Sequence, residues 1–325
     1  MNCQQKYVHY KSLVDHCLER FITQQKPRSL YEPLRYVLAG GGKRIRPVLL
    51  LLSCEAVGGK ARLAVQAAVG IEILHNFTLV HDDIMDNAGS RRGKSTVHTK
   101  WDTNVAILVG DELLALAYRA LLQTKSPNIQ EIAKVFTEGV VEVCEGQAYD
   151  NEFETRTNVT VHDYLCMIEK KTAKMVAVSA EIGALMGNGT RASIVALRRY
   201  GQHVGRAFQI QDDLLDIVAE EKEFGKAVGG DLVEGKKTFL LLEALRRARG
   251  SDRALLRDVV KNNGGSRRLI PEYRRIYQET GVLDAARCRI EQDIAQAKAE
   301  LHRFPSSDAR AMLVWFADML LNRTY

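Results

Sequence analysis

The chain has 325 residues, 46% of them hydrophobic, which is enough to bury a substantial core in one large domain or two ordinary ones. Its formal net charge of +6 is a mild surplus that suits a small anionic substrate as well as weak contact with nucleic acid. Since no stretch of about 18 apolar residues lacks a charge, the composition argues against a transmembrane span.

The N-terminal segment and the cysteines argue against further classes of protein. The first residues are polar and lack a signal-peptide core (MNCQQKYVHYKSLVDHC), so we expect a cytoplasmic protein. The cysteines show no CxxC spacing, which argues against a zinc site and against a disulfide framework. We expect buried, reduced thiols at Cys3, Cys17, Cys54, Cys144, Cys166 and Cys288.

Amphipathic helical periodicity is nearly continuous along the chain, and we find no convincing alternating strand. Helices are predicted, in chain order, over residues 6–23, 28–39, 45–57, 60–87, 103–123, 127–153, 161–187, 191–218, 237–248, 252–262, 267–302 and 307–322. The breaks between them carry glycine, serine and proline, as turns do. Because no strong linker divides the sequence, we predict one all-α domain over residues 1–325, built as a single large helical bundle.

Two aspartate-rich runs interrupt apolar parts of the predicted helices. Residues 82–86 read DDIMD and residues 212–216 read DDLLD, so both repeat the pattern DDxxD. The first and last aspartates of each run share a helix face, where their like charges repel. Burial would add a desolvation cost unless a cation offset it, and hard oxygen ligands favour Mg²⁺. We predict that the runs hold a diphosphate through Mg²⁺, with solvated helix ends as the alternative.

Basic residues flank both acidic runs. GGKRIRP lies upstream of the first run at residues 41–47, and RRG follows it at residues 91–93. The second run is followed by FGKAVGGDLVEGKKT at residues 224–238. Alone, GGKRIRP is also explained as a turn before a helix that begins near proline, and it is not a P-loop because the GK[ST] ending is absent. The cations are therefore either surface ion pairs or parts of the acidic site.

Taken together, these blocks resemble the trans (head-to-tail) polyprenyl diphosphate synthase family in order and spacing. The resemblance covers residues from about 35 to 240. It implies the isoprenoid synthase fold, an all-α bundle around a deep central cavity. It further implies a Mg²⁺-dependent prenyltransferase that condenses isopentenyl diphosphate with an allylic diphosphate, and a homodimer.

The resemblance also implies a cluster of about three Mg²⁺ ions that clamps the allylic diphosphate. The predicted ligands of the metal ions are Asp82, Asp86 and Asp212, with Asp150 as a further ligand. The residues predicted to act through water or to orient the ligands are Asp83, Asp213 and Asp216. Asp150 matches the family element GQxxD, in which Gln147 would orient it.

Two sets of basic residues would bind the two diphosphates. The allylic diphosphate would contact Arg91, Lys171, Lys226 and Lys236, and the isopentenyl diphosphate would contact Lys43, Arg46, His75 and Arg92. The residues expected to stabilise the developing allylic cation are Lys171, Thr172 and Gln209. Neighbouring lysines point about 100° apart on a helix, so only one of Lys170 and Lys171 can face a cavity, and the family pattern KT selects Lys171. His75 alone is also explained as a core histidine.

Product length in this family depends on residues beneath the first acidic run. Phe77 lies five residues before Asp82, roughly 7 to 8 Å deeper along the helix, where a ring should stop the growing tail. The small Thr78 beside it completes an arrangement similar to archaeal-type enzymes, which implies geranylgeranyl diphosphate (C20). Farnesyl diphosphate (C15), a longer product and simple core packing of Phe77 are the alternatives.

Other interpretations concern different functions. A class I terpene cyclase would carry a different second motif, and a non-catalytic subunit of a heteromeric synthase would lose acidic residues, whereas both runs are whole here. Clustered arginines more simply form solvated helix faces than a nucleic-acid platform, since no aromatic stacking pattern accompanies them. These arginines are Arg246, Arg247, Arg249, Arg253, Arg267, Arg268, Arg274 and Arg275.

Overall fold

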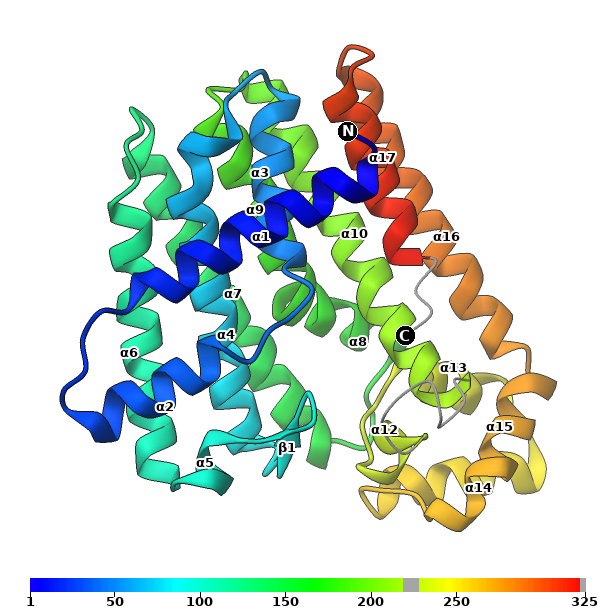
Figure 1. Cartoon of the computed structure of the whole chain (residues 1–325). Coiled ribbons are helices and arrows are strands. Elements are labelled where there is room, and N and C mark those ends of the chain that lie inside the picture. The colour runs from blue at the N-terminus through cyan, green and yellow to red at the C-terminus, as the bar shows by residue number, and fades with distance from the viewer. Residues whose placement is uncertain (219–227, 322–325) are drawn as a thin grey trace. The chain divides into compact units, whose positions relative to one another are not determined.

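The computed structural model describes residues 1–218 and 228–321, and these residues fold almost entirely as helices (Figure 1). The prediction of an all-α fold is therefore confirmed. The chain divides into two compact units, each assembled from segments that are distant in sequence. Unit 1 comprises Met1–Phe136, Ser179–Ile194 and Ser307–Met312, and unit 2 comprises Thr137–Val178, Val195–Ser306 and Leu313–Tyr325.

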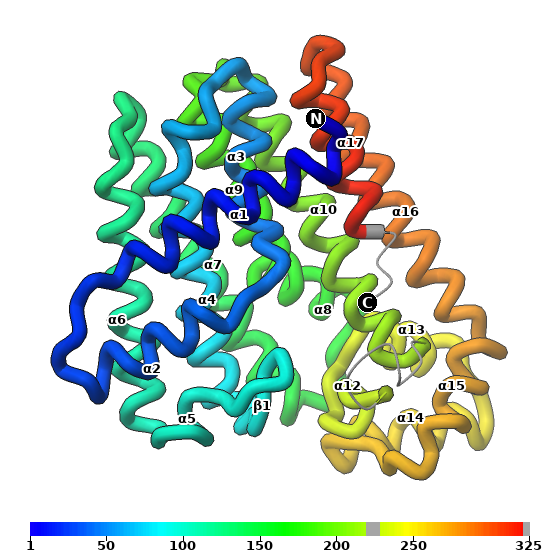
Figure 2. The backbone as a smooth tube through the Cα atoms, viewed as in Figure 1, coloured from blue at the N-terminus to red at the C-terminus, as the bar shows by residue number. Residues whose placement is uncertain are grey.

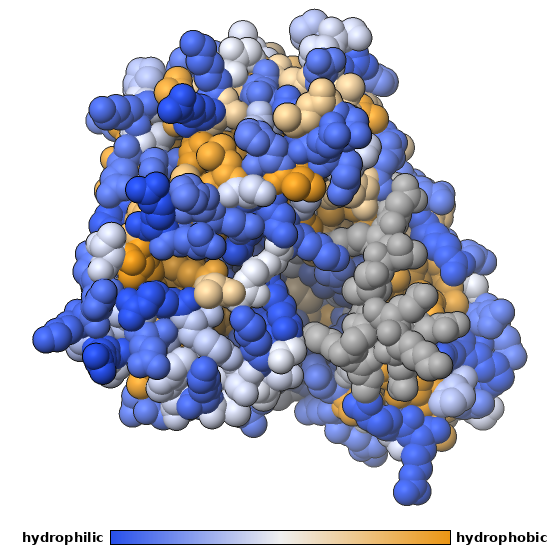
Figure 3. Space-filling view, in the orientation of Figure 1, coloured by the Kyte–Doolittle hydropathy of each residue, from blue (hydrophilic) through white to orange (hydrophobic). Residues whose placement is uncertain are grey.

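Unit 1 is built around the long apolar helix α4. Its elements are α1 (Cys3–Phe21), α2 (Arg28–Leu38), α3 (Ile45–Ala56), the 3-10 turn η1 (Ala61–Ala64), α4 (Val65–Met85), β1 (Ser90–Arg91), β2 (Lys94–Ser95), α5 (Val97–Lys100) and α6 (Thr103–Leu122). Helix α4 packs along α6, and α1 and α3 pack against it (Figure 1). Because α4 is apolar on most faces, it is buried between these neighbours. Hydrophilic side chains cover most of the visible face of α1 and α2 (Figure 3).

One segment of unit 1 has the length and composition of a membrane span. Among the described residues this is Ala61–Met85, with a mean hydropathy of 1.5 in its most apolar window. Of that window, 72% is buried inside the protein. Core helices pass the same test of length and composition, so burial against α3 and α6 accounts for the apolar sequence of this segment.

Unit 2 contains the second acidic run and most of the C-terminal half. Its own elements are α8 (Val161–Ile168), the π-helical turn η2 (Glu169–Ala173), α12 (Gly230–Val233), α13 (Phe239–Arg247), α14 (Gly250–Lys261), η3 (Arg267–Leu269), α15 (Ile270–Glu279), α16 (Val282–Glu300) and η4 (Leu301–Arg303). Helices that contribute residues to both units are α7 (Ile129–Thr155), α9 (Lys174–Met186), α10 (Arg191–Val218) and α17 (Asp308–Leu321).

Two predicted helices are interrupted. The single helix predicted over 267–302 is wrong, because α15 ends at Glu279 and α16 begins at Val282. Gly281 between them has a φ of +66°, a left-handed conformation that glycine adopts without steric cost. The helix predicted over 161–187 is broken by the π-helical turn η2, a local widening that apolar periodicity does not reveal.

A short β-hairpin follows α4, which the sequence does not predict. Strands β1 and β2 pair antiparallel, with Ser90 opposite Ser95 (Figure 2). Two-residue strands are too short to show an alternating pattern. The turn between them places Arg92 and Gly93 at φ values of +52° and +72°, a left-handed pair typical of tight hairpins.

The expectation of six buried thiols is wrong. No disulfide joins any of the six, only Cys54 is buried, and Cys144, Cys166 and Cys288 are exposed. The exposed cysteines lie on the polar faces of helices, where a single small residue does not disturb the amphipathic pattern.

Candidate active site

The first acidic run ends α4. Asp82 and Asp83 lie in its last turn and Asp86 caps the helix. Asp83 is buried, and its Oδ1 accepts a hydrogen bond from Arg91 Nε at 2.6 Å. Burial raises the pKa of Asp83, and the positive charge of Arg91 opposes this rise. The hairpin thus turns Arg91, a predicted diphosphate contact, toward the acidic run.

Basic groups predicted to bind isopentenyl diphosphate gather in unit 1. Arg46 Nη1 lies 3.2 Å from His75 Nε2, and Arg92 donates to the carbonyl of Gly41 at the start of the GGKRIRP loop. Burial, with the charges of Arg46 and Arg92, holds the pKa of His75 well below its usual range. His75 is therefore neutral and accepts a hydrogen bond from Arg46. Lys43 lies in the same loop, and its carbonyl accepts a hydrogen bond from Tyr7.

Arg44 in the same loop makes contacts that the sequence analysis missed. Its side chain is buried, with Nε 2.7 Å from Asp15 Oδ1 and Nη1 2.5 Å from Glu72 Oε1. Arg44 has a φ of +53°, a conformation that costs free energy for a residue with a side chain. The two ion pairs hold it there, and so fix the loop that carries Lys43 and Arg46 to α1 and α4.

The predicted chain-length residues lie on α4 one turn before the acidic run. Phe77 is buried, and its ring meets the ring of His81 edge to face, with centroids 4.8 Å apart. Thr78 Oγ1 donates to the carbonyl of His75 at 2.9 Å, so its hydroxyl is held against the helix backbone. The ring of Phe77 therefore packs against that of His81 on the same face of α4.

The second acidic run lies near the end of α10 in unit 2. Asp213 is 6% exposed and accepts hydrogen bonds from Tyr164 at 2.6 Å and from Gln209 at 3.0 Å. Burial, together with the charges of Asp212 and Asp216, raises the pKa of Asp213 to about 7 despite these two bonds. Asp216 Oδ2 accepts from the backbone N–H of Asp231 at 3.2 Å.

Catalytic residues predicted for the allylic substrate meet in one pocket of unit 2. Lys171 Nζ lies 2.5 Å from Asp150 Oδ2, and Thr172 Oγ1 donates to Gln209 Oε1 at 2.9 Å. The pocket has a volume of about 110 Å³. It is lined by the predicted residues Asp150, Lys171, Thr172, Gln209, Asp213 and Lys236, and by Tyr164, Met167, Ile168, Asp231, Lys237 and Thr238. The structure thus brings six of the predicted site residues together.

The π-helical turn η2 shapes this pocket. It carries Lys171 and Thr172, and the extra residue in a π turn changes the direction in which the following side chains point. Helix α7 approaches the turn closely at Gly146, where an added Cβ would lie 2.3 Å from the backbone nitrogen of Lys171. Only glycine fits there, which explains the glycine of the GQxxD element and brings Asp150 within reach of Lys171.

Other predicted residues lie differently or outside the described structure. Gln147 donates to Asn151 at 3.0 Å rather than to Asp150, whose partner is Lys171. Lys236 Nζ is 3.1 Å from Glu234, at the edge of the pocket. Lys226 lies outside the described residues.

The donor set suits a divalent cation. Asp213 and Asp216 lie within one turn of α10, and the pKa of each is raised above its usual value, chiefly by burial. Burial and the charges of Asp216 and Asp213 also raise the pKa of Asp231 well above its usual range. A bound cation would offset this repulsion. Within residues 1–218 and 228–321, no three His, Cys, Asp or Glu side chains form a metal cage alone, and Mg²⁺ usually completes its shell with water and phosphate.

Comparison with known proteins decides the family. A polyprenyl synthetase family model matches residues 27–299. The chain belongs to the polyprenyl synthetase family. It is 40% identical over 324 residues to the geranylgeranyl pyrophosphate synthase of Geoglobus acetivorans, a match that covers 96% of this chain and 97% of that protein. As a family member, it is a trans-prenyl diphosphate synthase.

Solved structures of the family are similar along the whole chain. The geranylgeranyl pyrophosphate synthetase of Pyrococcus horikoshii Ot3 matches with a TM-score of 0.93 and 37% identity, covering 98% of this chain and 99% of that one. A polyprenyl synthase from Caulobacter crescentus CB15, complexed with calcium and isoprenyl diphosphate, matches with a TM-score of 0.91 and 27% identity. That match covers 100% of this chain and 98% of the other. Polyprenyl synthetases generally use Mg²⁺.

Tyr164 and Asp231 are residues of this synthase pocket that the sequence analysis missed. Tyr164 is fully buried, and its hydroxyl donates to Asp213. Burial and the charge of Asp213 raise the pKa of Tyr164 well above its usual value, so the hydroxyl keeps its proton. Tyr164 lies in α8, directly before the turn η2 that carries the KT element, and its residue type alone indicates an ordinary core aromatic. Asp231 follows Gly229 and Gly230, so no helical periodicity in the sequence singles it out as a site residue.

We expect Tyr164→Phe to lower the free energy of unfolding by about 1–3 kcal/mol, because a buried carboxylate loses a hydrogen-bond donor. Chemical denaturation of the variant and the wild type measures this difference. Tyr149→Phe is the matched control, since Tyr149 is exposed and its loss should change stability by less than about 0.5 kcal/mol. Equal stability of Tyr164→Phe and the wild type would contradict the role of this bond.

Proposed function

We propose that this prenyltransferase extends an allylic diphosphate with isopentenyl diphosphate and releases geranylgeranyl diphosphate (C20), with about three Mg²⁺ ions bound. We also propose that residues 1–325 act as a single catalytic domain. The observation that carries the proposal is the pocket of unit 2, where the ammonium of Lys171, the amide of Gln209 and buried carboxylates converge.

Residues of unit 2 are suited to ionisation of the allylic substrate. When bound, Mg²⁺ neutralises the diphosphate that departs with both electrons of the C–O bond. In this proposal the ammonium of Lys171 turns from Asp150 toward that diphosphate as negative charge develops. The oxygens of Thr172 and Gln209 are already held by their mutual hydrogen bond, so their dipoles need no reorganisation to stabilise the allylic cation.

Residues of unit 1 are suited to hold the second substrate. Arg46 and Arg92 supply positive charge, while neutral His75 orients Arg46 without adding a repelling charge. The double bond of isopentenyl diphosphate then attacks the allylic cation, forming the new C–C bond. The proton lost in the last step goes to the departed diphosphate, so the reaction needs no protein base. It needs no protein nucleophile either, because the double bond is the attacking group.

Phe77 supports the C20 product. Its position on α4 is five residues before Asp82, which corresponds to roughly 7.5 Å along the helix axis. The ring is 8% exposed and packed against His81, so it cannot swing aside freely. A growing tail that descends along α4 from the acidic run would stop at such a fixed ring.

We expect Phe77→Ala to lengthen the main product by at least one isoprene unit, because removing the ring opens space for the tail. Chromatography of the products formed from isopentenyl and farnesyl diphosphate gives the distribution. Phe208→Ala removes an aromatic ring from α10 instead and should leave product length at C20. An unchanged distribution for Phe77→Ala would show that the floor lies elsewhere.

Diphosphate release tests the proposed reaction. We expect rapid release when the purified chain receives isopentenyl and farnesyl diphosphate together with Mg²⁺. Either substrate alone, or both substrates with EDTA, should release little diphosphate. Release from farnesyl diphosphate alone would favour a terpene cyclase. No release under any condition would favour a non-catalytic subunit.

We further propose a homodimer that works in the cytoplasm. Ile107 and Leu108 on α6 are 42% and 59% exposed, and such apolar side chains are commonly buried between subunits. Analytical ultracentrifugation should give twice the mass of the chain. A monomer would refute this assembly and leave the reaction untouched.

A further inference from the structure

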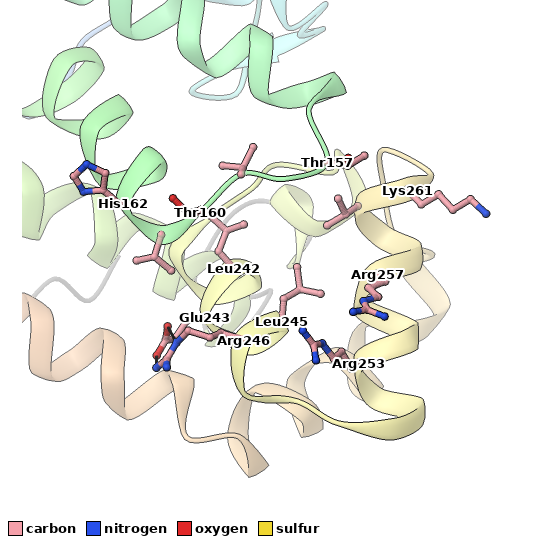
Figure 4. A pocket seen from close by; sticks show the side chains of 13 residues that line it. Thr157, Thr160, His162, Leu242, Glu243, Leu245, Arg246, Arg253, Arg257 and Lys261 are labelled. Carbon is pink, nitrogen blue, oxygen red and sulfur yellow. Dashed lines mark hydrogen bonds and ion pairs between the residues drawn. The ribbon is translucent and has the colours of Figure 1, made fainter.

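A second cavity in unit 2 lies apart from the pocket that holds Lys171. It has a volume of about 700 Å³, within the range of small-molecule sites. The segment before α8 forms one wall, and α13 and α14 form the other (Figure 4). None of its lining residues belongs to the pocket of Lys171 or to the acidic runs.

The floor of this cavity is apolar. Leu242 on α13 and Val260 on α14 are buried, and Leu245 is half-buried beside them. Val159 and Val161 close the floor from the opposite wall. These side chains line a recess and do not protrude, so they can bind the tail of a small molecule but cannot reach into a bilayer.

The rim is basic. Arg246, Arg253, Arg257 and Lys261 line it, against the single carboxylate of Glu243. Glu243 is already occupied, since Arg246 and Arg247 both donate to it at distances of 2.6 to 2.9 Å. The cavity therefore keeps a surplus of positive charge.

Arg253 and Arg257 are the cations of the rim that remain available to bind an anion. They lie four residues apart on α14, so their side chains share one face (Figure 4). Among the described residues, neither side chain has a hydrogen-bond or ion-pair partner, whereas nearby Arg275 is paired with Asp252 and Glu272. Lys261 extends away from the floor in Figure 4, so Arg253 and Arg257 are the groups placed to bind an anion.

We propose that this cavity binds a prenyl diphosphate at a second site, with Arg253 and Arg257 on the diphosphate and the tail on the floor around Leu242. Two adjacent guanidinium groups match the phosphate oxygens, and the apolar recess matches an isoprenoid chain. The class of ligand rests on the proposed function, whose substrates and product are prenyl diphosphates. The site itself is distinct from the reaction centre.

Calorimetric titration with geranylgeranyl diphosphate tests this site. The purified full chain is titrated in EDTA, which weakens binding at a metal-dependent active site. We expect Arg253→Ala/Arg257→Ala to weaken the metal-free binding by about 10- to 100-fold, because hydrogen bonds to charged groups are the strong ones. The control Arg267→Ala/Arg268→Ala removes two exposed arginines outside the cavity and should bind as the wild type does.

Further titrations identify the ligand chemistry. Inorganic diphosphate should bind at least about tenfold more weakly than geranylgeranyl diphosphate, because it leaves the apolar floor empty. Equal affinities, or binding only to phosphatidylglycerol vesicles, would overturn the proposal. Equal affinity of the wild type and of Arg253→Ala/Arg257→Ala for geranylgeranyl diphosphate would also overturn the proposal. Turnover should be normal in this variant. Absence of turnover by the wild type, with the metal-free binding intact, would refute the proposed function and leave this binding site standing.

Discussion

Lys171→Met should lower kcat/KM for the condensation by about 10²- to 10³-fold, as expected when one preorganised charge aimed at a developing anion is removed. Lys171 is held 2.5 Å from Asp150, at the edge of the pocket that also contains Gln209 and Asp213. Methionine keeps most of the volume of lysine and removes the charge. Steady-state kinetics with farnesyl diphosphate as the allylic substrate measures the loss.

Lys170→Met provides the matched control. Lys170 is adjacent in sequence, but its ammonium lies 2.7 Å from Glu145 and does not line the pocket. This ion pair is partly exposed, so its loss should change kcat/KM by less than about threefold. Equal losses in Lys170→Met and Lys171→Met would contradict the assignment of Lys171 as the residue that faces the substrate.

Arg44→Met should lower the free energy of unfolding by about 3–5 kcal/mol, because it leaves a buried carboxylate without its counter-charge. Arg44 and Glu72 are 5% and 2% exposed, and their charged atoms are 2.5 Å apart. Asp15, the other partner of Arg44, is 34% exposed at its side chain and can be solvated instead. The shift of the urea midpoint reports the loss.

Arg44→Met/Glu72→Gln tests the reason for that loss. The second substitution removes the buried charge, so the double variant should be more stable than Arg44→Met alone. Its activity should stay low, because the loop that carries Lys43 and Arg46 has lost its tie to α4. A double variant no more stable than Arg44→Met would show that the destabilisation does not arise from an unpaired Glu72.

The sequence predicts a helix correctly where the apolar periodicity stops at a clear boundary. Helix α10 spans Arg191–Val218, as the pattern predicts, because one amphipathic stripe runs uninterrupted up to the second acidic run. The break at Gly281 was not predicted, since a glycine within an amphipathic pattern is often tolerated. The π turn at Glu169–Ala173 was not predicted either, because apolar periodicity carries no sign of the extra residue in such a turn.

Residue type alone predicts part of the candidate site. Repeated aspartates in apolar helices stand out, whereas Lys171 and Thr172 are predicted only because their KT element resembles that of the family. Arg44, Tyr164 and Asp231 were missed, because each acts through a partner far away in sequence. The bond between Tyr164 and Asp213, for example, joins residues 49 positions apart. Such pairings follow from packing and leave no periodic signal.

The prenyl chain length of the product tests the central claim most directly. The purified chain is incubated with Mg²⁺, isopentenyl diphosphate and dimethylallyl, geranyl or farnesyl diphosphate in turn, and the products are identified by mass spectrometry. We predict that geranylgeranyl diphosphate (C20) predominates with every starter. A main product of C15, or one of C25 or longer, would contradict the stop at Phe77. The absence of any metal-dependent condensation would contradict the proposed function.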